Sequence, residues 1–185
     1  MYPNVSLYLR FSKAFDKVSH QKLLSKLAKY GISHQLLSWI DSFLSDRVQT
    51  VVIDGRESSK ASVSSGVPQG SIVGPALFLF YINDLPDTIN STVRLFADDT
   101  IIYKTAENHK MLQPDLRRLE TWEKEWDMEF HPLKYEHVTS TRKTTKRVNQ
   151  TFRLHSTQIP KVDKTKCLGV TINSKITWSD HITSV

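Results

Sequence analysis

The chain has 185 residues, of which 39% are hydrophobic and 24% are charged. This length allows a real hydrophobic core, and this balance excludes an intrinsically disordered chain. A single cysteine, Cys167, excludes an internal disulfide and a cysteine-rich zinc site. The longest apolar run, near residues 76–82, is far too short to span a bilayer. We therefore expect one intracellular domain over residues 1–185, nuclear or cytoplasmic, with no membrane partner.

A formal net charge of +6 favours a polyanionic partner such as nucleic acid. Part of this excess lies in the basic run of residues 142–147. Such runs are more often solvated loops than specific contacts, so the charge alone does not identify a function.

Apolar spacing and turn residues predict a mixture of helices and strands. In chain order we expect a strand over residues 5–11, helices from residues 19 and 33, a hairpin over 49–65, a loop over 66–71, a buried helix over 72–85, a hairpin near 94–104, an amphipathic helix over 108–130, and short strands thereafter. These elements do not alternate in a strict βαβ rhythm. This favours an α+β fold in which helices cover one side of a sheet.

The most informative segment is the pair Asp98-Asp99, which lies between two stretches of alternating apolar residues. The alternation predicts two strands, with the aspartates where the chain reverses. Adjacent carboxylates repel each other unless a cation lies between them, and Mg²⁺ is an oxygen-seeking ion that suits them. Such ions drive nucleotidyl transfer. Aspartate is also common in solvated turns, which is the more frequent origin of such a pair.

Three separated segments, residues 8–20, 66–75 and 96–99, combine with one another in a recognisable order. At these separations they resemble the palm of reverse transcriptases, specifically those of non-LTR (LINE-type) retrotransposons. Residues 128–134 and 166–178 fit the same family, so the resemblance covers nearly the whole chain. It implies a palm-like antiparallel sheet covered by helices, with partial fingers and little or no thumb.

The resemblance also implies a reaction. The family copies an RNA template by adding deoxynucleoside triphosphates to a DNA primer. Three acids hold two Mg²⁺ ions, one activating the primer 3′-hydroxyl and one neutralising the incoming triphosphate. Asp98 matches the acid that ligates metal directly, and Asp99 matches its neighbour.

Other positions match by the same resemblance. Phe15 matches the bulky residue that rejects a ribose 2′-hydroxyl, Gln69-Gly70 the loop beside the nascent base pair and template, and Lys134 a lysine near the departing pyrophosphate. From the residues alone, Phe15 is equally a core aromatic and Lys134 a surface charge. The Gln69-Gly70 pair is equally a turn that caps the following helix.

Four further residues receive structural interpretations. Asp16 precedes a helix, and its carboxylate can accept hydrogen bonds from the free N–H groups of that helix. His20 is interpreted as a packed or solvated histidine. We expect Trp122 and Trp126 to anchor the core.

Arg10 is the most consequential departure from the family, because it occupies the position of the first metal-binding aspartate. Arginine cannot shed its proton to become a ligand. The exchange replaces an attraction of roughly several kcal/mol for a divalent ion with a repulsion of similar order. We therefore expect weak metal binding and a truncated pseudoenzyme that is inactive or severely impaired.

Two alternatives to an active polymerase remain open. In the first, the chain is a non-catalytic, nucleic-acid-binding remnant of a retrotransposon, which keeps the fold and the basic surface. In the second, it is an unselected fragment that does not fold stably without its fingers and thumb.

Overall fold

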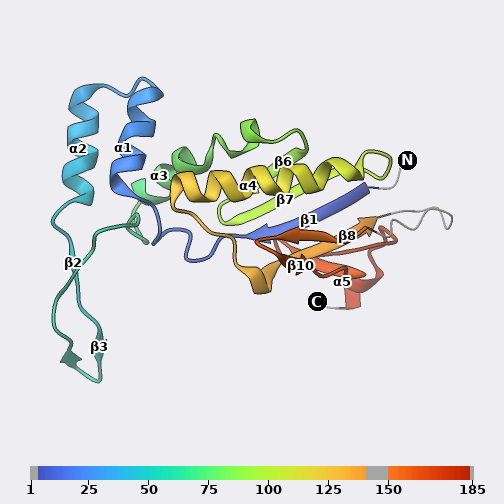
Figure 1. Ribbon diagram of the computed structural model, residues 1–185. Coiled ribbons are helices and arrows are strands. Elements are labelled where there is room, and N and C mark those ends of the chain that lie inside the picture. Colours follow the sequence, from blue (N-terminus) through green and yellow to red (C-terminus); the bar gives the residue numbers. More distant parts are fainter. Residues whose placement is uncertain (1–3, 141–149, 184–185) are drawn as a thin grey trace. The chain divides into compact units, whose positions relative to one another are not determined.

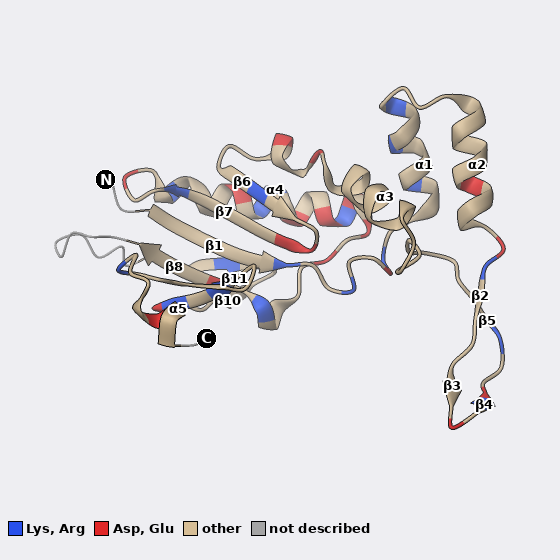
Figure 2. Ribbon diagram, turned by 180° about the vertical axis from the view of Figure 1, so that it is seen from behind, with Lys and Arg blue, Asp and Glu red and all other residues tan. Residues whose placement is uncertain are grey.

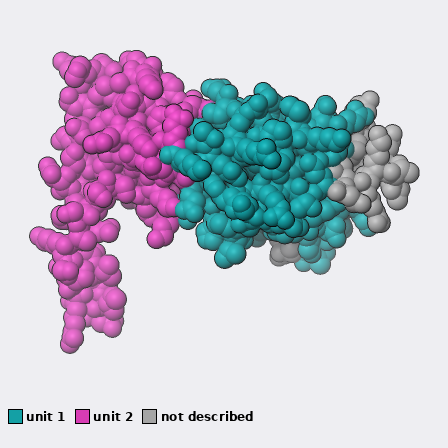
Figure 3. All heavy atoms as spheres, in the orientation of Figure 1, with its two compact units in different colours: residues 1–12, 85–124, 129–185 teal, residues 13–84, 125–128 magenta. Residues whose placement is uncertain are grey.

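The computed structural model of the protein describes residues 4–140 and 150–183. The chain divides into two compact units (Figure 3). Unit 1 consists of residues 1–12, 85–124 and 129–185, and unit 2 consists of residues 13–84 and 125–128. Division into compact units does not test whether residues 1–185 form a single domain, so that expectation stays a prediction. The basic run of residues 142–147 lies outside the described residues.

A four-stranded antiparallel sheet in the order β6-β7-β1-β8 is the framework of unit 1 (Figure 1). Its strands are β1 (Asn4–Arg10), β6 (Thr92–Phe96), β7 (Asp99–Thr105) and β8 (Glu136–Ser140). Along β1, Val5, Leu7 and Leu9 are buried, and the residues between them are half-buried. Successive side chains of a strand point to opposite faces, so one face of this sheet is apolar.

Helix α4 (Leu112–Trp126) covers that apolar face (Figure 1). It follows the short 3₁₀ turn η2 (His109–Met111). Apolar residues at helical spacing form its buried stripe: Leu112, Leu116, Leu119 and Trp122. Phe11, which follows β1, places its ring 5.9 Å from that of Trp122, so the end of β1 is held against the helix.

The amphipathic helix predicted over residues 108–130 is confirmed but is shorter than expected. It ends at Trp126 because Asp127 adopts a left-handed conformation with φ +53°, which no helix continues. Trp122 is 2% exposed and is a core anchor as predicted.

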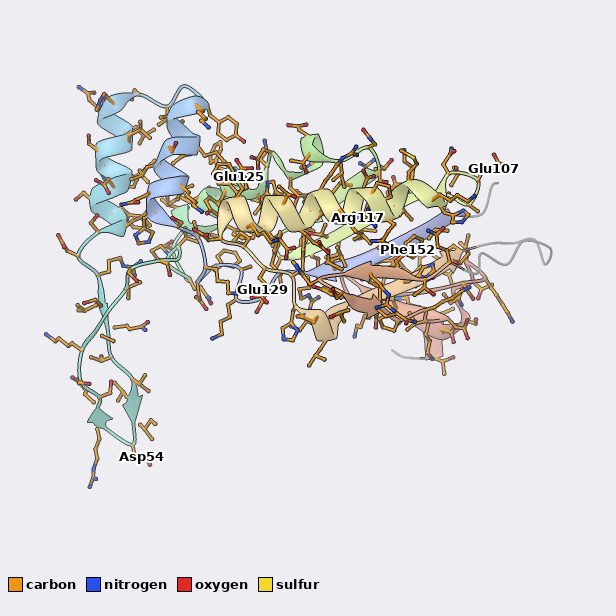
Figure 4. All side chains as sticks on the ribbon, viewed as in Figure 1. Asp54, Glu107, Arg117, Glu125, Glu129 and Phe152 are labelled. Atoms are coloured by element: carbon orange, nitrogen blue, oxygen red, sulfur yellow. The ribbon has the colours of Figure 1, made fainter. Side chains whose placement is uncertain are left out.

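Smaller elements complete unit 1. They are the 3₁₀ turns η1 (Leu85–Thr88) and η3 (Pro132–Lys134), the hairpins β9 (Phe152–Leu154) with β10 (Thr157–Ile159) and β11 (Lys164–Cys167) with β12 (Val170–Asn173), and the short helix α5 (Ser179–Thr183). Phe152, labelled in Figure 4, is fully buried on β9. The strands expected late in the chain are thus confirmed as two hairpins.

Glu123, near the end of α4, joins three segments of unit 1. Its carboxylate accepts a hydrogen bond from the Phe130 backbone N–H at 2.6 Å and lies 2.6 Å from the His155 ring Nε2. The side chain is 3% exposed, and this burial raises the pKa of Glu123. Phe130 in turn stacks on Phe11 with the ring centroids 4.1 Å apart. The helix, the residues after it and the β9–β10 turn therefore share one buried carboxylate.

Unit 2 contains three helices and a long hairpin. The helices are α1 (His20–Lys29), α2 (His34–Leu44) and α3 (Val73–Ile82), and the hairpin strands are β2 (Val48–Gln49), β3 (Val52–Ile53), β4 (Arg56–Glu57) and β5 (Ala61–Ser62). The helices predicted from residues 19 and 33 and over 72–85, and the hairpin over 49–65, are confirmed. Figure 4 shows Asp54 at the hairpin tip.

A buried lysine ties the helices of unit 2 together. The Lys26 ammonium, in a side chain that is 4% exposed, donates to the Tyr81 carbonyl at 2.5 Å and to the Asp84 carboxylate at 2.7 Å. It also lies 3.4 Å from the centroid of the Trp126 ring. Trp126 is half-buried and packs against Lys26 and the Tyr81 ring, so it lies at the edge of the core and not within it as predicted.

His137 on β8 is a buried histidine that stays neutral. It is 1% exposed, its ring Nε2 lies 3.1 Å from the Thr139 hydroxyl, and its ring meets Phe152 edge-on. Burial, followed by the positive charge of Lys161, lowers the pKa of His137 from 6.5 to about 4.

We predict that this histidine makes the protein less stable in acid. The unfolded chain binds the proton near pH 6.5, whereas the folded chain binds it only near pH 4, so stability is full above pH 6.5 and falls between these values. The free energy of unfolding, measured by urea denaturation, should drop by about 2–3 kcal/mol more in the parent than in His137→Gln over this range. His34→Gln, at an exposed histidine, serves as the control. Equal acid sensitivity of the parent and His137→Gln would contradict the assignment.

Candidate active site

The turn between β6 and β7 carries the aspartate pair. Phe96 pairs with Asp99 across the hairpin, which leaves Ala97 and Asp98 as the two turn residues, and Ala97 has φ +49°. Asp99 is thus the first residue of β7 rather than part of the turn. The Asp98 side chain is 39% exposed and the Asp99 side chain 22%, so both carboxylates are accessible.

Arg10 lies at the end of β1, directly opposite Asp99 in the antiparallel register. Its Nε donates to Asp99 Oδ1 at 2.6 Å and lies 3.6 Å from Asp98 Oδ2. Figure 2 shows this blue end of β1 beside the red turn between β6 and β7. The Phe11 N–H also donates to the Asp98 carbonyl at 3.0 Å. The sequence therefore brings together the three positions expected from the family, with a cation in one of them.

The ion pair fixes the charge state of this site. The hydrogen bond to Asp99 is the main reason that the pKa of Arg10 is raised, so the guanidinium stays charged. Exposed ion pairs contribute only about 0–1 kcal/mol to folding. The Arg10–Asp99 pair, which is partly exposed, therefore contributes little to the stability of the fold.

The residues at this end of the sheet do not fit a two-metal set. Two carboxylates are present, but the third position holds a donor group that cannot ligate a cation. Within residues 4–140 and 150–183, no group of three or more His, Cys, Asp or Glu side chains is arranged to hold a metal ion.

A pocket of about 280 Å³ lies beside the ion pair, and Arg10, Asp99 and Lys134 all line it. Lys134 reaches this place through η3, whose preceding residue His131 donates its N–H to the Arg10 carbonyl at 2.8 Å. The structure thus brings Lys134 and Asp99 to the same pocket. Lys166 on β11 lines the same pocket. From the sequence, Lys166 is only part of a segment that fits the family. Its place on the pocket follows from the position of β11 in the fold.

The remaining predicted site residues belong to unit 2. Phe15 is half-buried, and its ring stacks on Phe78 with the centroids 4.7 Å apart. Gln69 donates from Nε2 to the Asp16 carboxylate at 3.1 Å. Gly70 has φ +80°, a conformation that glycine adopts at little cost. The loop and the segment after β1 thus meet within unit 2.

The contact of Asp16 differs from the one expected, whereas His20 is the packed residue that was expected. Asp16 accepts a hydrogen bond from the amide of Gln69 and not from the N–H groups of a helix. His20 is half-buried, and its ring Nε2 lies 2.8 Å from the Gly66 carbonyl oxygen. Local sequence patterns carry no signal for either contact, since both join segments that are distant along the chain.

Comparisons with known proteins show the family of this chain. Residues 4–172 match the family described as reverse transcriptase (RNA-dependent DNA polymerase). The chain belongs to the reverse transcriptase family. Together with the relatives and the solved structure described next, this match confirms the resemblance to reverse transcriptases of non-LTR retrotransposons and the α+β, palm-like fold.

Relatives of this reverse transcriptase chain come from mobile elements. It is 31% identical to the RNA-directed DNA polymerase from mobile element jockey of Drosophila melanogaster, over 98% of this chain and 21% of that protein. It is 29% identical to the probable RNA-directed DNA polymerase from transposon X-element of Drosophila melanogaster, over 97% of this chain and 20% of that protein. The chain thus spans about a fifth of the length of these relatives.

A solved structure shares the fold. The apo telomerase from Candida tropicalis truncated from its C-terminal domain matches with a TM-score of 0.65 and 12% identity, over 96% of this chain and 35% of that chain. Within residues 4–140 and 150–183, no helix of the reverse transcriptase chain has the length and apolar character needed to cross a bilayer.

Gly66 gives a test of how the loop of unit 2 is held. It has φ +90°, and a Cβ atom at this position would lie 2.9 Å from the backbone of Phe15 and Asp16. We predict that Gly66→Ala lowers the free energy of unfolding by about 2–4 kcal/mol, combining backbone strain with a steric clash. The measurement is chemical denaturation followed by circular dichroism.

Gly55→Ala is the matched control, because Gly55 has φ +75° but no atom within 4 Å of its Cβ position. This variant should lose only about 1 kcal/mol. Equal losses in the two variants would show that the loop does not approach residues 15–16 closely.

Proposed function

We propose that this chain is a segment of an RNA-directed DNA polymerase in which Arg10 severely impairs the family reaction. The reaction is the addition of deoxynucleotides to a DNA primer on an RNA template, and the family is metal-dependent, with two Mg²⁺ ions as the expected set. The observation that carries the proposal is the 2.6 Å contact between Arg10 Nε and Asp99 Oδ1.

Electrostatics supports the impairment. The Arg10 guanidinium is paired with the Asp99 carboxylate. Its positive charge repels any divalent cation that approaches this carboxylate. Displacing Arg10 removes the repulsion only in part and does not restore the missing ligand. Asp98 and Asp99 remain the candidate metal ligands, and Arg10 is the reason that their affinity is low.

The other candidate residues keep the roles that the family resemblance implies. Lys134 acts near the departing pyrophosphate, which suits its place on the pocket beside Asp99. Phe15 excludes a ribose 2′-hydroxyl, and Gln69 with Gly70 contacts the nascent base pair and the template. The partners are then an RNA template, a DNA primer and deoxynucleoside triphosphates.

A non-catalytic, nucleic-acid-binding role is the second candidate. The net charge of +6 favours it, as does the placement of Lys134 and Lys166 on one pocket. Phosphate contacts of this kind do not require an active metal centre.

Primer extension on an RNA template tests the first proposal. We expect the parent chain to incorporate deoxynucleotides with Mg²⁺ at least about a hundredfold more slowly than Arg10→Asp, because the variant regains a carboxylate ligand. Adding Asp98→Ala to Arg10→Asp should abolish the gained activity. Arg56→Asp, which makes the same change at the exposed hairpin residue Arg56, should remain as slow as the parent.

One result would overturn the proposed impairment: incorporation by the parent at the rate of Arg10→Asp, lost on Asp98→Ala. A thermal melt of every variant accompanies the assay. Cooperative melting argues against the unselected-fragment hypothesis and shows that a slow variant is folded.

A gel-shift titration tests the binding role. We expect the parent to bind an RNA–DNA primer–template at low salt, with an affinity that falls as the salt concentration rises, because phosphate contacts release counterions. A folded chain without affinity at low salt would eliminate the binding role.

A further inference from the structure

Arg10 uses only part of its hydrogen-bonding capacity on the aspartates. Both contacts to Asp98 and Asp99 are made by Nε. Within the described residues, its two terminal NH₂ groups form no hydrogen bond, and the one hydrogen bond of the guanidinium is made by Nε. The side chain is 40% exposed and lines the pocket of about 280 Å³. A planar guanidinium fork anchored on one side is suited to bind an oxyanion through two parallel hydrogen bonds.

Two further cations line the same pocket. Lys134 comes from η3 and Lys166 from β11. Neither ammonium forms an ion pair or hydrogen bond with any other residue in the part of the chain that the structure describes. Against these three cations stand the carboxylates of Asp99 and Glu136. The lining thus has an excess of one positive charge. Because Arg10 neutralises Asp99, this excess comes from Lys134 and Lys166, which face the single carboxylate of Glu136.

Two other polar groups of the lining are uncharged, and Glu136 is held by a hydrogen bond. Burial raises the pKa of Tyr8 to about 12 and also raises that of Cys167, so the phenol and the thiol stay protonated at neutral pH. Glu136 is engaged by Thr165, whose hydroxyl donates to its carboxylate. The pocket therefore presents one guanidinium fork, two ammonium groups, neutral donors and the single carboxylate of Glu136 to a ligand.

We propose that this pocket binds a phosphoryl anion directly, through the Arg10 fork together with Lys134 and Lys166, without a divalent cation. The inference rests on the proposed function in that it concerns the same site, and it adds a ligand class that the site holds in its metal-free form. The pocket volume lies at the lower end of small-ligand sites, which suits a phosphate or pyrophosphate group.

Two sources of this anion share the chemistry: the polyphosphate of a free nucleotide and a phosphodiester of a nucleic-acid backbone. Inorganic pyrophosphate represents the first source, and a single-stranded oligodeoxynucleotide represents the second. If the oligonucleotide displaces pyrophosphate, the pocket also takes backbone phosphates. If both bind at once, the pocket takes the free polyphosphate. Either outcome supports the proposed anion site.

Isothermal titration with pyrophosphate in buffer containing EDTA tests the site. We expect the parent to bind, and Arg10→Lys to bind at least about tenfold more weakly, because lysine keeps the charge but loses the fork. Lys134→Ala and Lys166→Ala should each weaken binding by roughly threefold to tenfold. The matched controls Arg56→Lys and Lys60→Ala, at exposed residues outside the pocket, should bind like the parent.

Glu136→Gln provides a test of opposite sign. Glutamine still accepts the Thr165 hydroxyl, but the variant removes a negative charge from the lining, so pyrophosphate should bind several-fold more tightly. Unchanged circular dichroism and melting keep the comparison with the parent valid.

The proposal is overturned if the folded parent does not bind pyrophosphate in EDTA, or if Arg10→Lys binds as tightly as the parent. A requirement for Mg²⁺ would overturn it as well. These readouts do not involve primer extension, so failure of the anion site and failure of the proposed impairment are distinguishable.

Discussion

The antiparallel register between β1 and β7 is the constraint on which the site depends. It places Arg10 opposite Asp99, and alternation along both strands then puts the two side chains on one face of the sheet. The apolar neighbours Leu9 and Phe11 point to the other face, where α4 covers them. The same alternation thus builds the core and orients the charges. A shift of the register by one residue would exchange the two faces.

The Arg10–Asp99 pair changes what the aspartates can do. A bound metal ion brings charge and open coordination positions, and it can leave. A guanidinium brings a charge that is covalently attached, with donors in a fixed plane and no capacity to accept a ligand. The turn between β6 and β7 therefore keeps a permanent counter-ion. This distinguishes the chain from what the reverse transcriptase family implies, even though its fold is that of the family.

Much of this arrangement was predictable from the sequence, because periodicity and turn residues are local signals. They indicated the strands around Asp98, the helices of unit 2 and the buried stripe of α4. The family motif indicated Arg10 as the exceptional position. The contacts of Glu123 with His155, of Lys26 with Asp84, and of Lys166 with the pocket were not predictable, since each joins segments far apart in the chain. The end of α4 was also missed, because the left-handed backbone at residue 127 belongs to an aspartate and not to a glycine.

The carboxylate of Glu123 connects segments that are distant along the chain. It accepts a hydrogen bond from the backbone N–H of Phe130. The next residue, His131, donates its backbone N–H to the carbonyl of Arg10. On its other oxygen, Glu123 holds the ring of His155. A short series of hydrogen bonds therefore connects the β9–β10 turn to the charged end of β1. The position of the Arg10–Asp99 pair therefore depends in part on a turn that is distant from it along the chain.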